Sequence, residues 1–303
     1  LHYIIRFLLG EDIPGEIVAA IGYTNNIKHF ERYSIVIIPS GFFSSRVYGT
    51  ASSLPELPLQ EIEGTPLLFG SPLVELVGET LVIHADIIAS TYFLITRYEE
   101  IIQRNVRDEH GRFPGKQSLP YRAGFLHRPI VDEYRLLLRK WLQQYGLRIP
   151  DVKKEIQHIY LTHDLDMPTL YRTWKGVIRS VRDKRGILQS VQGKYGPLEE
   201  DPYYTFPWLF EQNNVLREQV GKDICQAILF IRSGGKTKQD KPRYSLRSKD
   251  IGQLLESVYS NDMAIGLHAS YQAGLSPDLI KKEKAVLEEH TGKSIRLNRH
   301  HFL

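Results

Sequence analysis

Two aspartates end an apolar run near the middle of the chain. The run Ile159-Tyr160-Leu161 leads into Thr162-His163-Asp164-Leu165-Asp166. Alternate side chains of an extended strand share a face, so Asp164 and Asp166 are expected to point the same way at its carboxyl end. Two neighbouring carboxylates repel each other unless a divalent cation, a shared proton or an arginine compensates them. This spacing is therefore typical of a hydrolytic site rather than of a structural element.

Histidines follow two later apolar segments. His268 comes after Ile265-Gly266-Leu267, and His300 and His301 come after Asn298-Arg299. A single histidine is more often a satisfied polar residue than a ligand. One carboxylate with two imidazoles, however, is a known donor set for Zn²⁺ or a similar divalent ion, with positions left open for water. The residue types therefore predict a metal site.

The elements that must position these side chains alternate along the second half of the chain. Apolar patterns predict strands at 156–162, 223–231, 263–268 and 294–299, separated by helices at 211–220, 248–260 and 277–292. Such alternation predicts an α/β fold with a parallel sheet or a β/α barrel. Reactive groups gather at the carboxyl ends of the strands in these folds, which is where the aspartates and histidines stand.

The first half of the chain predicts a separate, mixed α/β domain. Strands are expected at 34–39 and 81–84, followed by a helix through Ile101 that Asp86 caps, and by a polar stretch at 104–117. A further helix is expected at 131–145, with Gly146 as its C-cap. His84 and Asp86 are interpreted as a strand end and a helix cap. A polar hinge at 150–155 separates domains 1–152 and 153–303.

Composition excludes several classes of protein. The chain has 303 residues, 42% hydrophobic and 24% charged, with a net charge of +4. This mild charge lacks the clustered basic stripe of a nucleic-acid binder. No apolar stretch approaches the roughly 20 residues of a transmembrane helix, and no signal-peptide pattern is visible. A single cysteine, Cys225, is expected to be a buried packing thiol in a reducing, cytoplasmic setting. Nothing indicates an oligomeric state.

Short motifs in the second half resemble the polysaccharide deacetylases of carbohydrate esterase family four, which have the NodB-like fold. The resemblance implies a distorted β/α barrel and a metal, most simply Zn²⁺, that serves the removal of N-acetyl groups. Carried onto this sequence, Asp164 becomes the base and Asp166 a metal ligand. The second motif of the family has two histidines, of which His268 matches the first and Gln272 replaces the second.

One branch of that family resembles this sequence more closely than the common pattern does. It has a segment like Gly266–Tyr271 and another like Asn298–Phe302, in which His301 takes the position of the branch's histidine. Strand alternation also puts Arg299 and His301 on one face. His301 is therefore preferred to His300 as the third ligand, and Arg299 is expected to hold Asp164 ionised. Further likenesses are Asp201–Phe206, and Gly111–Pro114 with Tyr121–Leu126 from an uncharacterised domain that precedes such deacetylases.

The barrel of the family continues beyond the fourth strand. Its later strands carry further motifs, including a late histidine that acts as general acid, whereas this sequence stops at Leu303. We therefore expect an incomplete barrel, truncated at the C-terminus, in which no general acid is assigned. Exposed sheet edges and helix faces would be an unstable end to a barrel, so a fragment is expected.

Three functions compete. The first is an N-deacetylase acting on an amino-sugar polysaccharide or saccharide, and the second is a non-catalytic glycan-binding or assembly module that keeps the fold, as Gln272 and the missing motifs suggest. The third is amide hydrolysis of a small non-sugar substrate. Basic residues flank the site and are interpreted first as a solvated helix face and a mobile loop. The alternative is a rim that attracts an acidic glycan or a nucleotide-linked sugar. These residues are Arg172, Lys175, Arg179, Arg182, Lys184, Arg185, Lys236, Lys238, Lys241 and Arg243. Nearby aromatic residues are expected either to stack on sugars or to fill a core: Tyr203, Tyr204, Phe206 and Trp208.

Overall fold

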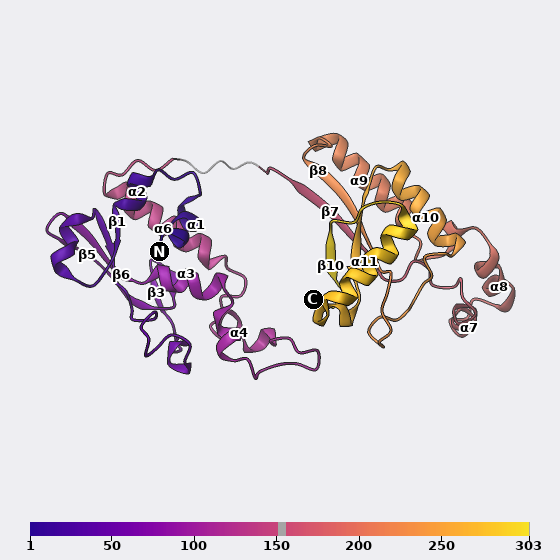
Figure 1. Ribbon diagram of the computed structural model, residues 1–303, viewed down its shortest axis with the longest axis horizontal. Coiled ribbons are helices and arrows are strands. Elements are labelled where there is room, and N and C mark those ends of the chain that lie inside the picture. The colour runs from indigo at the N-terminus through magenta and orange to yellow at the C-terminus, as the bar shows by residue number, and fades with distance from the viewer. Residues whose placement is uncertain (151–155, 303) are drawn as a thin grey trace. The chain divides into compact units, whose positions relative to one another are not determined.

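The computed structural model describes residues 1–150 and 156–302, and its chain divides into two compact units (Figure 1). Unit 1 spans Leu1–Lys153 and unit 2 spans Lys154–Leu303. The predicted hinge falls on residues 151–155 and so lies outside the described residues, as does the predicted domain boundary. Each unit has its own hydrophobic core, and the two are described separately.

Unit 1 is built on a mixed sheet with the strand order β1-β2-β6-β5. The first three strands of that order are parallel and β5 pairs antiparallel with β6. A separate antiparallel pair, β3 with β4, completes its strands. The strands are β1 Ile21–Tyr23, β2 Ile35–Ile37, β3 Gln60–Ile62, β4 Thr65–Leu67, β5 Gly70–Val77 and β6 Thr80–Ala85. The helices are α1 His2–Leu9, α2 Gly15–Ala19, α3 Ile87–Ile95, α4 Tyr98–Ile102, α5 Leu119–Arg122 and α6 Ile130–Gln144, with short 3₁₀ turns η1 Ile27–Arg32, η2 Ala51–Ser53 and η3 Gly115–Gln117.

The predicted elements of unit 1 are confirmed, with two corrections. The helix expected to run from Asp86 to Ile101 is two helices, because Arg97 adopts a left-handed backbone conformation (φ 52°) between α3 and α4. The apolar residues keep their helical spacing across Arg97, so the sequence pattern alone does not reveal the break between the two helices. The second correction is that α6 ends in a cap at Tyr145, and Gly146 follows with φ 82°, where its N–H donates to the carbonyl of Gln143.

Unit 2 contains a curled, four-stranded sheet of half-barrel form, in which all strands are parallel and follow the order β7-β8-β9-β10 (Figure 1). The predicted alternation of strands and helices with a parallel sheet is thus confirmed. The assignment to a NodB-like barrel stays a prediction. The strands are β7 Ile159–Leu165, β8 Cys225–Ile231, β9 Ala264–Ala269 and β10 Asn298–His300. The helices are α7 Trp174–Arg182, α8 Ile187–Tyr195, α9 Phe206–Val220, α10 Lys249–Ser260 and α11 Pro277–Thr291, with 3₁₀ turns η4 Leu198–Glu200 and η5 Tyr271–Leu275.

Several predicted bounds in unit 2 were wrong. Strand β7 begins at Ile159 and continues through Leu165, so Asp164 lies within the strand and Asp166 directly follows it. Helix α9 begins at Phe206, with Pro207 in its first turn, where the missing N–H of proline costs no hydrogen bond. Strand β10 is shorter than expected and begins only at Asn298.

Helices α7 and α8 were not predicted, and they pair at the edge of unit 2 (Figure 1). They meet through small residues: the hydroxyl of Ser190 donates to that of Ser180 at 2.8 Å, and both serines are buried. Their large apolar side chains, such as Ile178 and Leu188, are exposed instead. The apolar spacing of this region therefore does not mark its buried side.

The core of unit 2 surrounds the parallel sheet and supports the strand ends. The predicted packing role of Cys225 is confirmed, since it is a free cysteine with 0% exposure. Gly266 in β9 has the ring of Phe230 against its backbone, so that a Cβ there would lie 2.5 Å from the ring. This close packing fixes β9 against β8 just before His268. Across residues 1–150 and 156–302, no helix has the length and apolarity to cross a membrane.

Candidate metal centre

Three strand ends of unit 2 bring Asp166, His268 and His301 together. Asp166 directly follows β7, His268 lies in β9 and His301 directly follows β10. The Oδ1 atom of Asp166 lies 3.3 Å from His268 Nε2 and 3.3 Å from His301 Nδ1, and these two nitrogens are 3.1 Å apart. Within the described residues, this is the one group of three acidic, histidine or cysteine side chains found with ligand atoms so close.

The register of the parallel sheet places the two imidazoles side by side. Arg299 of β10 is the partner of His268 in β9. The N–H of His301 continues the ladder by donating to the carbonyl of Ala269 at 2.8 Å. Two parallel strands that end together present their last side chains at one edge. The approach of the imidazoles therefore follows from strand pairing and not from their spacing along the chain.

Backbone carbonyls favour one tautomer of each ring, and at His301 the carbonyl is closer to Nε2 than the Arg232 guanidinium, whose Nη1 lies 3.5 Å from that nitrogen. His268 Nδ1 lies 3.1 Å from the carbonyl oxygen of Arg299, and His301 Nε2 lies 2.9 Å from that of Gln239. A carbonyl oxygen only accepts, so these outer nitrogens are the donors. In the neutral rings, the inner nitrogens then direct lone pairs at each other and at the Asp166 carboxylate. Three acceptors that face one another need a positive charge between them.

The donor set fits a divalent metal of the zinc type. A tetrahedral zinc ion with bonds of about 2.0–2.1 Å holds its ligand atoms roughly 3.3–3.4 Å apart, close to the separations in this cluster. The outer N–H···O=C bonds of both histidines are the supporting contacts that metal-bound imidazoles ordinarily make. Because the protein supplies three ligands, a fourth position would stay open to water or substrate.

Arg232, which the sequence analysis missed, supports the cluster from beside it. Its side chain is almost fully buried, with Nη1 3.7 Å from Asp166 Oδ1 and Nη2 donating to the Asp166 carbonyl at 3.1 Å. Arg232 directly follows β8, so it occupies the remaining strand end of the same sheet. Its position after the predicted strand 223–231 was the signal that could have found it.

The pKa of Asp166 is held below its ordinary value. A hydrogen bond from His268 is the largest cause, which applies when a proton rather than a metal occupies the inner nitrogen of that ring; the charges of His301 and Arg232 add to it, while partial burial opposes them. The carboxylate therefore stays ionised in the cluster. An ionised carboxylate is the form that binds a metal.

Asp164 and Arg299 form the second predicted pair. Arg299 Nη1 donates to Asp164 Oδ1 at 3.1 Å, and Nη2 donates to the Thr162 hydroxyl at 2.8 Å. The guanidinium also lies 4.8 Å from the centre of the Phe230 ring. Both charged side chains are about one-third exposed, so the pair is open to solvent on one side. The arrangement holds a carboxylate in a fixed orientation at the same edge of the sheet as the cluster.

The other candidates fall outside the cluster. His300 is not among the three clustered residues, and its Nδ1 is buried without a hydrogen-bond partner in the described part of the chain. Gln272 lies in the short helix η5. Among the aromatic candidates, Tyr204 and Phe206 are buried in the core of unit 2, whereas Tyr203 and Trp208 are exposed. Core packing thus accounts for half of that set.

Asp86 of unit 1 behaves as the sequence predicts. Its carboxylate accepts the N–H of Ala89 at 2.9 Å and so caps α3. His84 lies in β6 and its Nε2 is 2.8 Å from Glu75 Oε1 of the neighbouring strand. Both side chains are thus used by the local structure of unit 1.

Comparison with known proteins reaches only unit 1. Residues 1–146 match the model of a family described as a family of unknown function, DUF7033. No curated protein matches the chain, and no solved structure matches it. The matched residues end before β7, so the clustered aspartate and histidines lie wholly outside them.

Proposed function

We propose that unit 2 is a metal-dependent hydrolase that removes N-acetyl groups from an amino-sugar polysaccharide or saccharide. In this proposal the curled parallel sheet within residues 153–303 belongs to a NodB-like fold. The observation that carries the proposal is the convergence of one carboxylate oxygen and two imidazole lone pairs at 3.1–3.3 Å, with the outer ring nitrogens committed to carbonyls. Such a set of acceptors is suited to hold a divalent cation and leaves a position open for chemistry.

The residues divide into two tasks. Asp166, His268 and His301 would hold the metal, which when bound polarises a carbonyl and lowers the pKa of water. Asp164 would take the proton of the water as it attacks the acetamide carbon. Arg299 would keep Asp164 ionised and oriented through their 3.1 Å contact. Collapse of the tetrahedral adduct breaks the C–N bond and releases acetate, and the departing nitrogen takes up one proton, which balances the proton that Asp164 removed from the water.

Two independent features favour hydrolysis over a purely structural metal site. A structural zinc site is usually closed by four protein ligands, whereas this cluster offers three. A second carboxylate with its own arginine stands on the same strand as Asp166, which a structural site does not need. The resemblance of Gly266–Tyr271 and Asn298–Phe302 to deacetylase motifs then supports the acetamide as the bond that is cleaved.

A non-catalytic glycan-binding or assembly module is the second candidate. Gln272 favours it, because the common pattern of the family has a metal-binding histidine at that position. Such a module could keep the fold without holding a metal tightly. Metal binding therefore separates the two functions.

The first experiment is metal analysis of the purified chain after reconstitution with Zn²⁺, together with the His268→Ala variant. The proposal expects near one equivalent of metal in the wild type and a loss of that metal in the variant. His127→Ala is the control, because His127 is exposed and lies in unit 1. Equal metal content in all three proteins, or none in any of them, would move the conclusion to the non-catalytic module.

The second experiment is release of acetate from N-acetylglucosamine oligomers and from small non-sugar acetamides. A metal-loaded protein that cleaves only the sugars supports the deacetylase. Cleavage of the small amides alone would instead assign a general amidohydrolase.

A further inference from the structure

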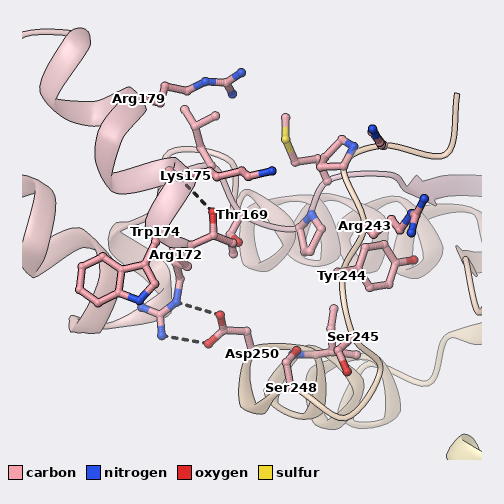
Figure 2. A pocket seen from close by; sticks show the side chains of 18 residues that line it. Thr169, Arg172, Trp174, Lys175, Arg179, Arg243, Tyr244, Ser245, Ser248 and Asp250 are labelled. Atoms are coloured by element: carbon pink, nitrogen blue, oxygen red, sulfur yellow. Dashed lines mark hydrogen bonds and ion pairs between the residues drawn. The ribbon is translucent and has the colours of Figure 1, made fainter. Parts of the chain in front are cut away.

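A large cavity lies beside the metal centre in unit 2. Its volume is about 1180 Å³, it is open to solvent on one side, and two segments line it: residues 167–179, which include the start of α7, and residues 241–251, which lead into α10 (Figure 2). Ligand sites for molecules of substrate size usually have volumes of about 300–1,000 Å³. The cavity therefore has room for a sugar together with a charged group.

The cavity is lined by an excess of positive charge. Five basic side chains line it, against the single carboxylate of Asp250: Arg172, Lys175, Arg179, Lys241 and Arg243. Arg172 neutralises that carboxylate through two hydrogen bonds of 2.9 Å each (Figure 2). The remaining four cations have no carboxylate partner within the described residues.

The side chains of three of these residues have neither a hydrogen bond nor an ion pair in the part of the chain that is described: Lys175, Arg179 and Lys241. Among the described residues, the Arg243 side chain donates only to the carbonyl of Lys236. Figure 2 shows Lys175 and Arg179 projecting from α7 on one side of the cavity and Arg243 standing on the opposite segment. A concave surface with one sign of charge concentrates the electrostatic potential and attracts ions of the other sign. These unpaired donors are suited to an anion.

The same arginine contacts both the cavity wall and the metal centre. Met167, which lines the cavity, directly follows Asp166. Arg232 lies beside Asp166 and also donates to the carbonyl of Pro242 at 2.6 Å, while its own N–H donates to the hydroxyl of Tyr244 at 2.7 Å. Both Pro242 and Tyr244 line the cavity. A ligand in the cavity would therefore reach the edge of the metal centre.

We infer that this cavity binds the diphosphate group of an activated saccharide. Arginine forks and lysine charges together match the several oxygens and the multiple negative charges of a diphosphate better than a single carboxylate does. The sugar would extend toward Met167 and the metal centre. This inference rests on the proposed function for its saccharide part, and it narrows the substrate to a diphosphate-linked one.

Calorimetric titration of pyrophosphate into the whole chain tests the anion site without any turnover. The variant Lys175→Gln/Arg179→Gln removes two of the unpaired cations, whose side chains are exposed, so that folding is expected to be kept. Affinity for pyrophosphate should fall at least about tenfold. Lys222→Gln/Lys282→Gln is the charge-matched control, since both lysines are exposed and outside the cavity, and it should bind as the wild type does.

The same titration is repeated on the His268→Ala variant, after treatment of each protein with a chelator. Unchanged pyrophosphate affinity there is expected, because the cavity cations do not ligate the metal. The anion site and the deacetylase can thus fail separately: loss of metal chemistry with intact pyrophosphate binding overturns only the proposed function. Equal weakening by the cavity variant and by the control, or no binding in the wild type, overturns the diphosphate site.

Two diphosphate esters then identify the carrier of the sugar. Uridine diphosphate represents a nucleotide carrier, and farnesyl diphosphate represents a lipid carrier. An ester that binds more tightly than pyrophosphate, and that loses affinity in Lys175→Gln/Arg179→Gln as pyrophosphate does, supports the inference. It also shows whether the carrier of the sugar is a nucleotide or a lipid. Weaker binding of both esters than of pyrophosphate would contradict an activated saccharide as the ligand.

Discussion

The two units place an aspartate at the same position relative to a parallel strand and use it differently. Asp86 directly follows β6 in unit 1, and Asp166 directly follows β7 in unit 2. Asp86 is completely buried and surrounded by donors, namely the hydroxyl of Tyr23, the N–H and hydroxyl of Ser40, and the N–H of Ala89, all at 2.7–2.9 Å. Three of these donors reach Oδ2 and one reaches Oδ1, so groups of the fold itself hold both oxygens of the carboxylate.

Asp166 has the opposite surroundings. Its side chain is 51% exposed, and the atoms nearest to its Oδ1 are one nitrogen from each of the two imidazole rings. The other nitrogen of each ring lies within hydrogen-bond distance of a backbone carbonyl. The pKa values also differ: burial raises the pKa of Asp86, whereas the neighbouring His268, with His301 and Arg232, lowers that of Asp166. A carboxylate at a strand end is structural where its neighbours supply donors. It is available to a cation where its neighbours supply lone pairs.

The largest contrast between the two regions is expected in turnover. Asp164→Asn removes the proposed base and should lower acetate release by about 10²–10⁴-fold, while the metal content stays unchanged. Asp86→Asn should leave the rate per folded molecule as it is, since Asp86 lies in the other unit. Rates and metal content measured on the same preparations check this. Full activity of Asp164→Asn would remove Asp164 from the mechanism.

The next contrast concerns the metal itself. Asp166→Ala should weaken metal affinity by more than about 100-fold, because loss of a direct ligand exceeds the 10–100-fold cost of losing a supporting contact. Without metal, its free energy of unfolding should stay close to that of the wild type, because the side chain is half exposed. Competition with a chromophoric chelator measures the affinity. Unaltered affinity in Asp166→Ala would show that the metal binds elsewhere.

In unit 1, unlike in unit 2, replacing the aspartate at the strand end should change the free energy of unfolding. Asp86→Ala leaves the donors of Tyr23, Ser40 and Ala89 unpaired in a buried site, and should lower the free energy of unfolding by about 2 kcal/mol. Denaturant titration followed by circular dichroism measures it. Asp132→Ala is the matched control, because Asp132 is exposed in the first turn of α6, and it should change stability by no more than about 0.5 kcal/mol. Similar losses in both variants would refute the structural role of Asp86.

The smallest expected effect is a dependence on pH. The folded-state pKa of Asp86 is raised above its ordinary value of 3.8, so the folded chain binds this proton more tightly than the unfolded chain does. The contribution of Asp86 to stability is therefore full below pH 3.8 and is lost as pH rises through its folded pKa. The free energy of unfolding of the wild type, relative to Asp86→Asn, should accordingly increase on acidification. A difference that stays constant with pH would contradict the raised pKa.

Local pattern was enough to predict much of the fold. The strand at 81–84, the cap at Asp86, and the parallel alternation of unit 2 follow from periodicity and from residues at element ends. The site candidates Asp164, Asp166 and His268 were likewise visible, because a polar residue after an apolar run marks a strand end. The break at Arg97 was not, since one left-handed residue leaves the apolar spacing intact.

By itself, the sequence determined which residue types stand at which strand ends, because secondary structure depends mainly on neighbours along the chain. Only the tertiary structure decided what surrounds each of them. Strand register brought His301, which strand alternation already favoured over His300, beside His268, and backbone carbonyls from Arg299 and Gln239 lie at the outer nitrogens of the two rings. Arg232 entered the site from the neighbouring strand, and the helices α7 and α8 packed through serines. Contacts between residues far apart in the chain carry no periodic signal, so they emerge only when the sheet is assembled.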